Sequence, residues 1–192
     1  MFENILKNVG LKIDLTDSEK EKFTSLLDYK FIPKKTMLLQ EGEICQFEFY
    51  LQKGCVRTYY IDNNGFEVTL QFGVEDWWIS DIASFHEQKP SKLFIETLED
   101  SDMFMLSVKA KEELLKEIPK FERLFRTLVQ RKLCAIQNRL IDTISKTAQE
   151  RYLDFLGLYP NIPQRVAQHY IASYLGISPE FVSKIRKRIH NS

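Results

Sequence analysis

The chain has 192 residues, of which 44% are hydrophobic and 12% aromatic, and its 27 basic side chains balance 27 acidic ones. This composition supports a packed core, which argues against disorder, and the zero net charge excludes a uniformly basic nucleic-acid binder. The start of the chain lacks a signal sequence, no stretch of about 18 uncharged apolar residues occurs, and the three cysteines form no CxxC pair, so we expect a cytoplasmic protein without membrane contact.

The first half of the sequence predicts one short helix followed by many strands. The helix is introduced by the capping box Thr16-Asp17-Ser18-Glu19. The clearest hairpin signal is Asn64-Gly65, because this dipeptide tolerates the positive φ angles of a tight turn. Short strands separated by turn residues indicate a sandwich or a barrel-like roll. The expected strands are Thr36–Leu39, Phe47–Gln52, Val56–Ile61, Glu67–Phe72, Leu93–Leu98 and Met103–Val108.

After Pro119 the pattern becomes helical for about seven turns, to about Lys146. Apolar residues recur on this helix at steps of three and four. The length favours pairing with a second copy of the chain, and the alternative is an ordinary core helix. The expected dimer interface consists of Val129, Leu133, Ile136, Leu140 and Ile144.

The last segment of the chain is basic although the whole chain is neutral. From Lys146 to the end, seven Lys and Arg residues stand against three acidic ones, which gives a net charge of +4. Such a segment favours contact with a polyanion, and that component of binding weakens steeply with salt. A solvated charged helix face is the alternative interpretation.

Within this segment, residues 165–189 have the pattern of a helix-turn-helix. Ala172 is small where a second helix must cross closely, and Gly176 permits the tight turn. Ser178 is a good N-cap and Pro179 suits the first helical position. The inward stripe of the second helix is Val182, Ile185 and Ile189. A helical hairpin that never touches DNA is the alternative.

The outward residues of the second helix are candidates for DNA contacts. In the major groove Lys donates to guanine and Glu accepts from cytosine. The candidates for base contacts are Glu180, Ser183, Lys184 and Lys187. The candidates for phosphate contacts are Gln168, His169, Ser178, Arg186 and Arg188.

These features together resemble the Crp/Fnr superfamily, the catabolite activator and fumarate-nitrate regulators, in particular its short Bacteroidetes members. The resemblance covers essentially the whole chain. It is carried by Glu41-Gly42-Glu43, Phe49 to Gly54, Val56-Arg57, Asn64-Gly65 and Ile171 to Glu180, in the family's order. It implies an α+β protein with a cyclic-nucleotide-binding-like β-roll over residues 1–118, a dimerisation helix over 119–146 and a winged-helix-like domain over 147–192.

The resemblance also implies roles for individual residues. Glu180 and Lys184 match base-reading positions, and Pro179 stands where the catabolite activators have a base-contacting Arg, which predicts a different target sequence. The sequence stops at Ser192, where relatives continue into a wing, so we expect the wing to be absent. The implied protein is a homodimer that reads a palindromic operator, with RNA polymerase as a further candidate partner.

The sensor part departs from the family where a cyclic nucleotide would bind. Cyclic-nucleotide binders hold the phosphate with a Gly-Glu-Leu segment and a later Arg, the natural bidentate anion partner. Here the segment reads Trp78 to Ala83 and the Arg position falls at Ser91. We therefore expect no cyclic AMP binding. Trp77 and Trp78 either pack in the core or line an apolar effector pocket, whose candidate residues are Trp77, Trp78, Ser80, Asp81, Ser91 and Lys92.

No cofactor, metal site or catalytic pair is predicted. Three scattered cysteines cannot hold an iron-sulfur cluster, and His86, His169 and His190 form no metal-binding spacing. We therefore expect a regulator and not an enzyme. Two alternatives stay open at this point: a small-molecule-binding or cupin-like β-roll, and a structural dimer that does not bind DNA.

Overall fold

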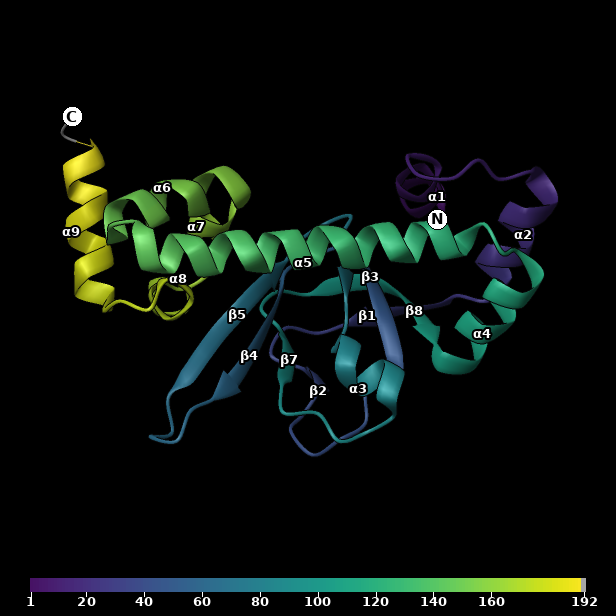
Figure 1. Cartoon of the computed structure of the whole chain (residues 1–192), viewed down its shortest axis with the longest axis horizontal. Coiled ribbons are helices and arrows are strands. Elements are labelled where there is room, and N and C mark those ends of the chain that lie inside the picture. The colour runs from purple at the N-terminus through teal and green to yellow at the C-terminus, as the bar shows by residue number, and fades with distance from the viewer. Residues whose placement is uncertain (191–192) are drawn as a thin grey trace. The chain divides into compact units, whose positions relative to one another are not determined.

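The computed structural model describes residues 1–190 and has an α+β fold, as predicted (Figure 1). The final two residues of the predicted domain 147–192 lie outside the described residues, as does the side chain of His190. The chain divides into two compact units. Unit 1 contains residues 1–58 and 72–131, and unit 2 contains residues 59–71 and everything from residue 132.

Two four-stranded sheets form the roll, with strand orders β1-β8-β3-β6 and β2-β7-β4-β5. The central strand β8 pairs antiparallel with β1 on one side and with β3 on the other. The strands are β1 Asp28–Ile32, β2 Met37–Leu39, β3 Phe47–Lys53, β4 Val56–Ile61, β5 Glu67–Gly73, β6 Trp78–Ile79, β7 Phe94–Thr97 and β8 Ser101–Ser107. The predicted strands are therefore confirmed, with small shifts at their ends.

The middle parts of strands β3 and β8 are buried on both faces of their sheet. Because side chains alternate along a strand, neighbouring residues of these strands enter different core clusters. Phe49 and Met103 belong to a core cluster with residues of both sheets. Tyr50 and Phe104 belong to a second cluster with helices of unit 1. These helices are α1 Glu3–Gly10, α2 Asp17–Ser25, α4 Val108–Glu117 and the start of α5.

Several local signals are confirmed. Thr16 and Glu19 form the capping box at the start of α2. At the β4–β5 turn, Gly65 has a φ of 84° and the Asp62 carboxylate accepts hydrogen bonds from the amides of Asn64 and Phe66. The turn before β4 depends on Gly54, whose φ is 110° and whose Cβ, if present, would lie 2.2 Å from Ser101 Oγ.

The long helix α5 spans Phe121–Ser145, as predicted, and contributes to both units. In the part of unit 2 that the structure describes, four helices follow it: α6 Ala148–Leu158, α7 Ile162–Arg165, α8 Gln168–Leu175 and α9 Pro179–His190. Among the described residues, no helix is both long enough and apolar enough to cross a membrane.

Candidate nucleic-acid interface

The helices α8 and α9 form a tight helical hairpin in unit 2. Gly176 takes the left-handed conformation that the turn requires, with a φ of 66°. The amide of Ile177 donates to the carbonyl of Ala172, which is buried where the two helices meet. Val182 and Ile185 of α9 are buried, as the sequence pattern predicts for the inward stripe. The hairpin therefore has the turn and the buried stripe of a helix-turn-helix.

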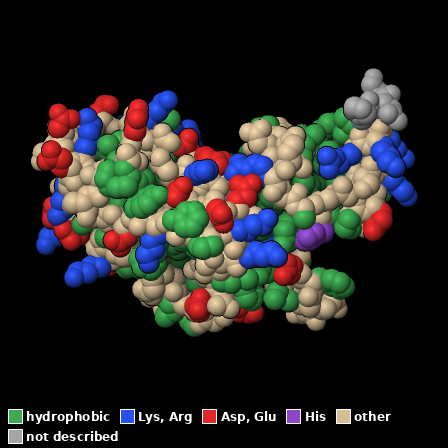
Figure 2. Space-filling model, turned by 180° about the vertical axis from the view of Figure 1, so that it is seen from behind, with side chains coloured by type: hydrophobic (Ala, Val, Ile, Leu, Met, Phe, Trp, Pro, Cys, Tyr) green, Lys and Arg blue, Asp and Glu red, His purple; other side chains and the backbone are tan. Residues whose placement is uncertain are grey.

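The outer face of α9 combines one carboxylate with four cationic side chains. Figure 2 shows Lys and Arg side chains gathered over the end of the molecule that holds α9. All of the predicted charged DNA contacts on this helix are exposed to solvent, and they are Glu180, Lys184, Arg186, Lys187 and Arg188. A basic exposed helix of this kind attracts a polyanion.

The first turn of α9 is well defined. The Ser178 hydroxyl caps it, accepting a hydrogen bond from the amide of Phe181 at 3.2 Å. The pKa of Glu180 lies below its ordinary value, because its carboxylate accepts from its own backbone amide and from the Ser178 hydroxyl, and because Lys184 is nearby. Glu180 is therefore an ionised acceptor held at the start of the helix.

Gln168 braces α8 against α9. Its Nε2 donates to the carbonyl of Pro179 at 2.6 Å and to Ser183 Oγ at 2.8 Å. The sequence placed Gln168 among the phosphate contacts and Ser183 among the base contacts, and the structure brings these two side chains together. His169 is exposed at the start of α8.

The β4–β5 hairpin and α8 are joined within unit 2. Ser173 Oγ accepts from the amide of Thr69 at 2.9 Å and donates to the carbonyl of Glu67 at 2.6 Å. Arg139 of α5 donates to the carbonyls of Leu70 and Tyr174, and its guanidinium lies 4.0 Å from the centre of the Tyr174 ring. We call these six residues the clasp.

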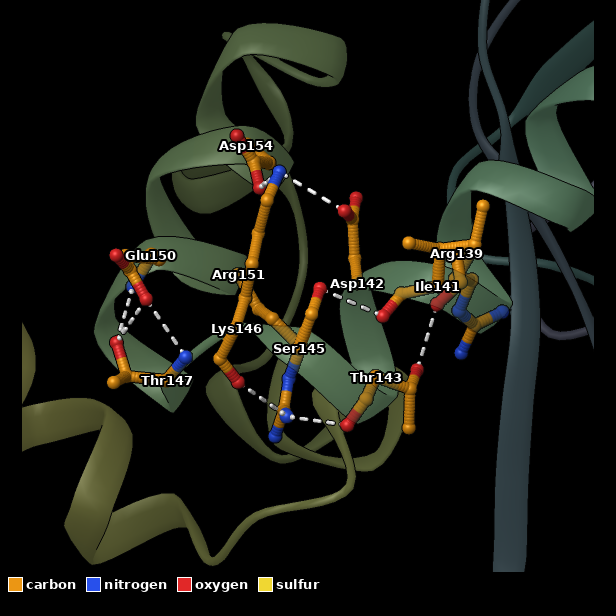
Figure 3. A network of polar contacts seen from close by, with 10 residues as sticks. All are labelled: Arg139, Ile141, Asp142, Thr143, Ser145, Lys146, Thr147, Glu150, Arg151 and Asp154. Carbon is orange, nitrogen blue, oxygen red and sulfur yellow. Dashed lines mark hydrogen bonds and ion pairs between the residues drawn. The ribbon is translucent and has the colours of Figure 1, made fainter.

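A second polar network surrounds the joint between α5 and α6 (Figure 3). Lys146 bridges Asp142 at 3.0 Å and Asp154 at 2.8 Å. Thr147 and Glu150 form the capping box that begins α6. Arg151 donates to the carbonyls of Lys146 at 3.2 Å and of Leu175 at 3.3 Å, the latter in α8. The joint is therefore braced by charges from both helices.

The predicted dimer stripe on α5 lies on the surface of the single chain. Each of its residues is exposed, from 43% at Val129 to 81% at Ile144. An apolar row of this length is unusual on a solvated helix face.

In unit 1 one of the candidate effector residues, Asp81, is the N-cap of a short helix, α3 Ile82–Glu87. The carboxylate of Asp81 accepts from the amides of Ala83 and Ser84 and from the Ser91 hydroxyl, the last at 2.7 Å. Lys92 is exposed, and Ser80 is buried. Asp81 and Ser91, ten residues apart, are thus brought together by a hydrogen bond.

The two tryptophans lie in different places. Trp78 packs with Tyr50 and Phe125 against the helices of unit 1, whereas Trp77 packs against the cluster between the sheets.

Two hollows of about 470 and 360 Å³ lie beside β2 and β3, lined in common by Leu38, Phe47 and Phe49. Their linings include none of the six candidate effector residues. Among the described residues, no three His, Cys, Asp or Glu side chains are grouped as a metal site.

Comparison with known proteins agrees with this architecture. The sequence profile of the family described as "Cyclic nucleotide-binding domain" matches residues 29–118. The regulator CLP of Xanthomonas campestris superposes with a TM-score of 0.72 at 15% identity, with 92% of each chain covered. The chain has the Crp/Fnr fold. No curated protein sequence matches it.

Two further structures with the Crp/Fnr fold are similar over most of their length. FixK2 from Bradyrhizobium japonicum gives a TM-score of 0.73 at 18% identity, covering 86% of this chain and 85% of that one. A structure from Eubacterium rectale assigned to the crp/fnr family of transcriptional regulators gives 0.70 at 18% identity, covering 92% and 84%. The predicted β-roll, long helix and C-terminal helices are therefore confirmed.

Sequence reasoning missed three residues of this region. Arg139 and Ser173 act through partners far away in the sequence, so no local pattern marks them. The sequence does mark Phe181, because it is a large apolar residue that lies next to the inward stripe of α9 without being part of that stripe.

Proposed function

We propose that this protein is a DNA-binding transcriptional regulator of the Crp/Fnr type that uses α9 as its recognition helix. The observation that carries the proposal is the first half of α9, where an ionised Glu180 and an exposed Lys184 stand one turn apart on a helix that Gly176 and Gln168 hold against α8. These two side chains suit cytosine and guanine edges in the major groove. A non-enzymatic role in the cytoplasm follows, with RNA polymerase as the candidate protein partner.

The proposed active form is a homodimer that reads a palindromic operator. The exposed stripe from Val129 to Ile144 supports it, because pairing two copies removes this apolar surface from water. A two-fold dimer presents two recognition helices to two half-sites about one DNA turn apart.

We further propose that the sensor domain takes no cyclic nucleotide. The Asp81 carboxylate already accepts the hydrogen bonds of the two amides at the start of α3, so an incoming phosphate would have to displace a like charge. The Arg57 guanidinium is paired with Glu96, with Nη2 to Oε2 at 2.8 Å, inside the roll. Addition of cyclic AMP or cyclic GMP is expected to leave the melting temperature of the protein unchanged; an increase that grows with nucleotide concentration would contradict this proposal.

The joint between α5 and α6 is the proposed site of regulation. An effector or partner would bias its geometry and so decide whether both α9 helices fit adjacent major grooves. If no ligand or partner changes the affinity of the dimer for its operator, the protein is a constitutive binder and the switch is wrong.

The test is enrichment of genomic DNA fragments by the purified full chain at two salt concentrations. The informative variant is the double substitution Glu180→Ala, Lys184→Ala. Its matched control is Glu112→Ala, Lys116→Ala, an exposed Glu and Lys at the same spacing on α4 of unit 1. We expect selective enrichment with the native chain and the control, weaker at high salt, and its loss in the Glu180, Lys184 variant. Failure of the native chain to bind any DNA at low salt would favour a structural dimer instead.

A further inference from the structure

We infer that Phe181 is a base-reading residue that contacts the 5-methyl group of a thymine in the major groove. The inference rests on the proposed function and deepens it by naming a feature of the target sequence. Phe181 is 40% exposed, whereas Val182 and Ile185 of the same helix are buried. The ring is therefore available to a ligand of this surface.

The position of Phe181 places it where bases are read. It follows Glu180 in the first turn of α9, and its amide is fixed by the Ser178 cap at 3.2 Å. Residues three and four apart on a helix are neighbours, so Phe181 lies beside Lys184 and, through it, in line with Arg188. Both of these cations are exposed. The ring in the first turn of α9 is in line with these cations, so it is carried to the DNA when they bind it.

The chemistry of the groove decides what the ring would touch. Phosphates, sugars and most base edges in the major groove are polar, and the thymine 5-methyl is the apolar group among the features that the bases present there. Removing a methyl group and part of the ring from water stabilises the complex through the hydrophobic effect. A thymine next to the base pairs read by Glu180 and Lys184 is therefore the expected partner.

The side of α9 that carries Ser183 contacts α8. Ser183 faces Gln168, which ties that side of the helix to α8. Ser183 therefore has less freedom to adapt to a base than Phe181 has, because its hydroxyl already has a partner within the protein. This difference makes Phe181 the more informative residue for target specificity.

The experiment removes one methyl group at a time. The full chain first selects a binding sequence from a random duplex pool, and each thymine of the selected duplex is then replaced by uracil, symmetrically in both halves. We expect one position at which uracil weakens binding by the native protein about fourfold per half-site. The Phe181→Ala variant should bind more weakly overall and show no penalty at that position, and Phe181→Leu should keep part of it.

The control is Leu158→Ala, an equally apolar exposed side chain on α6, 49% exposed, which should keep the full uracil penalty. Circular dichroism of each variant checks that α9 is intact. Binding with the same affinity for every uracil duplex, or an unchanged penalty in Phe181→Ala, would overturn this inference and leave the proposed function standing. Failure to select any duplex would overturn the proposed function, and this inference with it.

Discussion

Replacing Arg139 by methionine is expected to loosen the clasp, because methionine keeps the apolar stem and removes the guanidinium. The lost hydrogen bonds are those to the carbonyls of Tyr174, at 2.6 Å, and of Leu70. A hydrogen bond from a charged donor contributes about 1.5 kcal/mol or more, and the stacking on the Tyr174 ring adds about 0.5–1 kcal/mol. Since Arg139 is half-buried, we expect unit 2 to lose about 2–4 kcal/mol in total.

Hydrogen exchange measured by mass spectrometry detects this loss of stability in individual segments of the chain. The amides of residues 67–71 and 173–177 should exchange at least about 30-fold faster in Arg139→Met, because local opening becomes cheaper by the stated amount. Arg139→Lys should fall between, since it keeps the charge without the fork. The control is Arg126→Met, an exposed arginine of the same helix in unit 1. Unchanged exchange in both segments would show that the clasp does not stabilise unit 2.

Three other predictions follow from the same structure. Ile136→Asp should raise the dissociation constant of the proposed dimer at least about 100-fold, measured by analytical ultracentrifugation, because it buries an unpaired charge. The control, Asn138→Asp on another side of α5, should leave this constant unchanged. If Ile136→Asp still dimerises as the native chain does, the stripe is not the interface. Gly54→Ala should cost at least about 3 kcal/mol in urea unfolding, since its φ is 110° and Ser101 fills the space, and a loss below about 1 kcal/mol would refute this. The pKa of Glu150 lies below its ordinary 4.5 because the backbone amide and the hydroxyl of Thr147 donate to it. The stabilisation that the Glu150 carboxylate gives is therefore complete above about pH 4.5 and is lost as the pH falls through the folded pKa. The thermal midpoint of Glu150→Gln should therefore fall less in acid than that of the native chain, and midpoints that fall in parallel would contradict this.

Features set by neighbouring residues were predictable from the sequence. The turn at Gly176 and the cap at Ser178 depend on backbone conformation and on groups within one turn of helix, so a single sequence reveals them. The strands of the roll were also predicted, because alternation and turn residues are local. The short elements α1, α3, α4, β1 and β6 were not, since stretches of this length and composition carry little periodic signal.

Features set by distant partners were not predictable. The bond between Thr69 and Ser173 joins residues 104 positions apart, and Arg139 meets Leu70 across 69 positions. The sequence shows that the Gly, Glu and Arg of a cyclic-nucleotide site are replaced in this chain. It does not show that the Asp81 carboxylate binds the amides of α3, because an Asp that precedes a helix can accept hydrogen bonds from several different groups.

Unit 2 is not a continuous piece of the chain. The polypeptide leaves unit 1 after Thr58, returns at Phe72 and crosses again inside α5. A fragment cut at residue 132 would therefore lack the strand edge that Ser173 and Arg139 bind. Recombination or domain grafting at that point would transfer α8 and α9 without the hairpin that α8 binds, so residues 59–71 have to be exchanged together with the C-terminal helices.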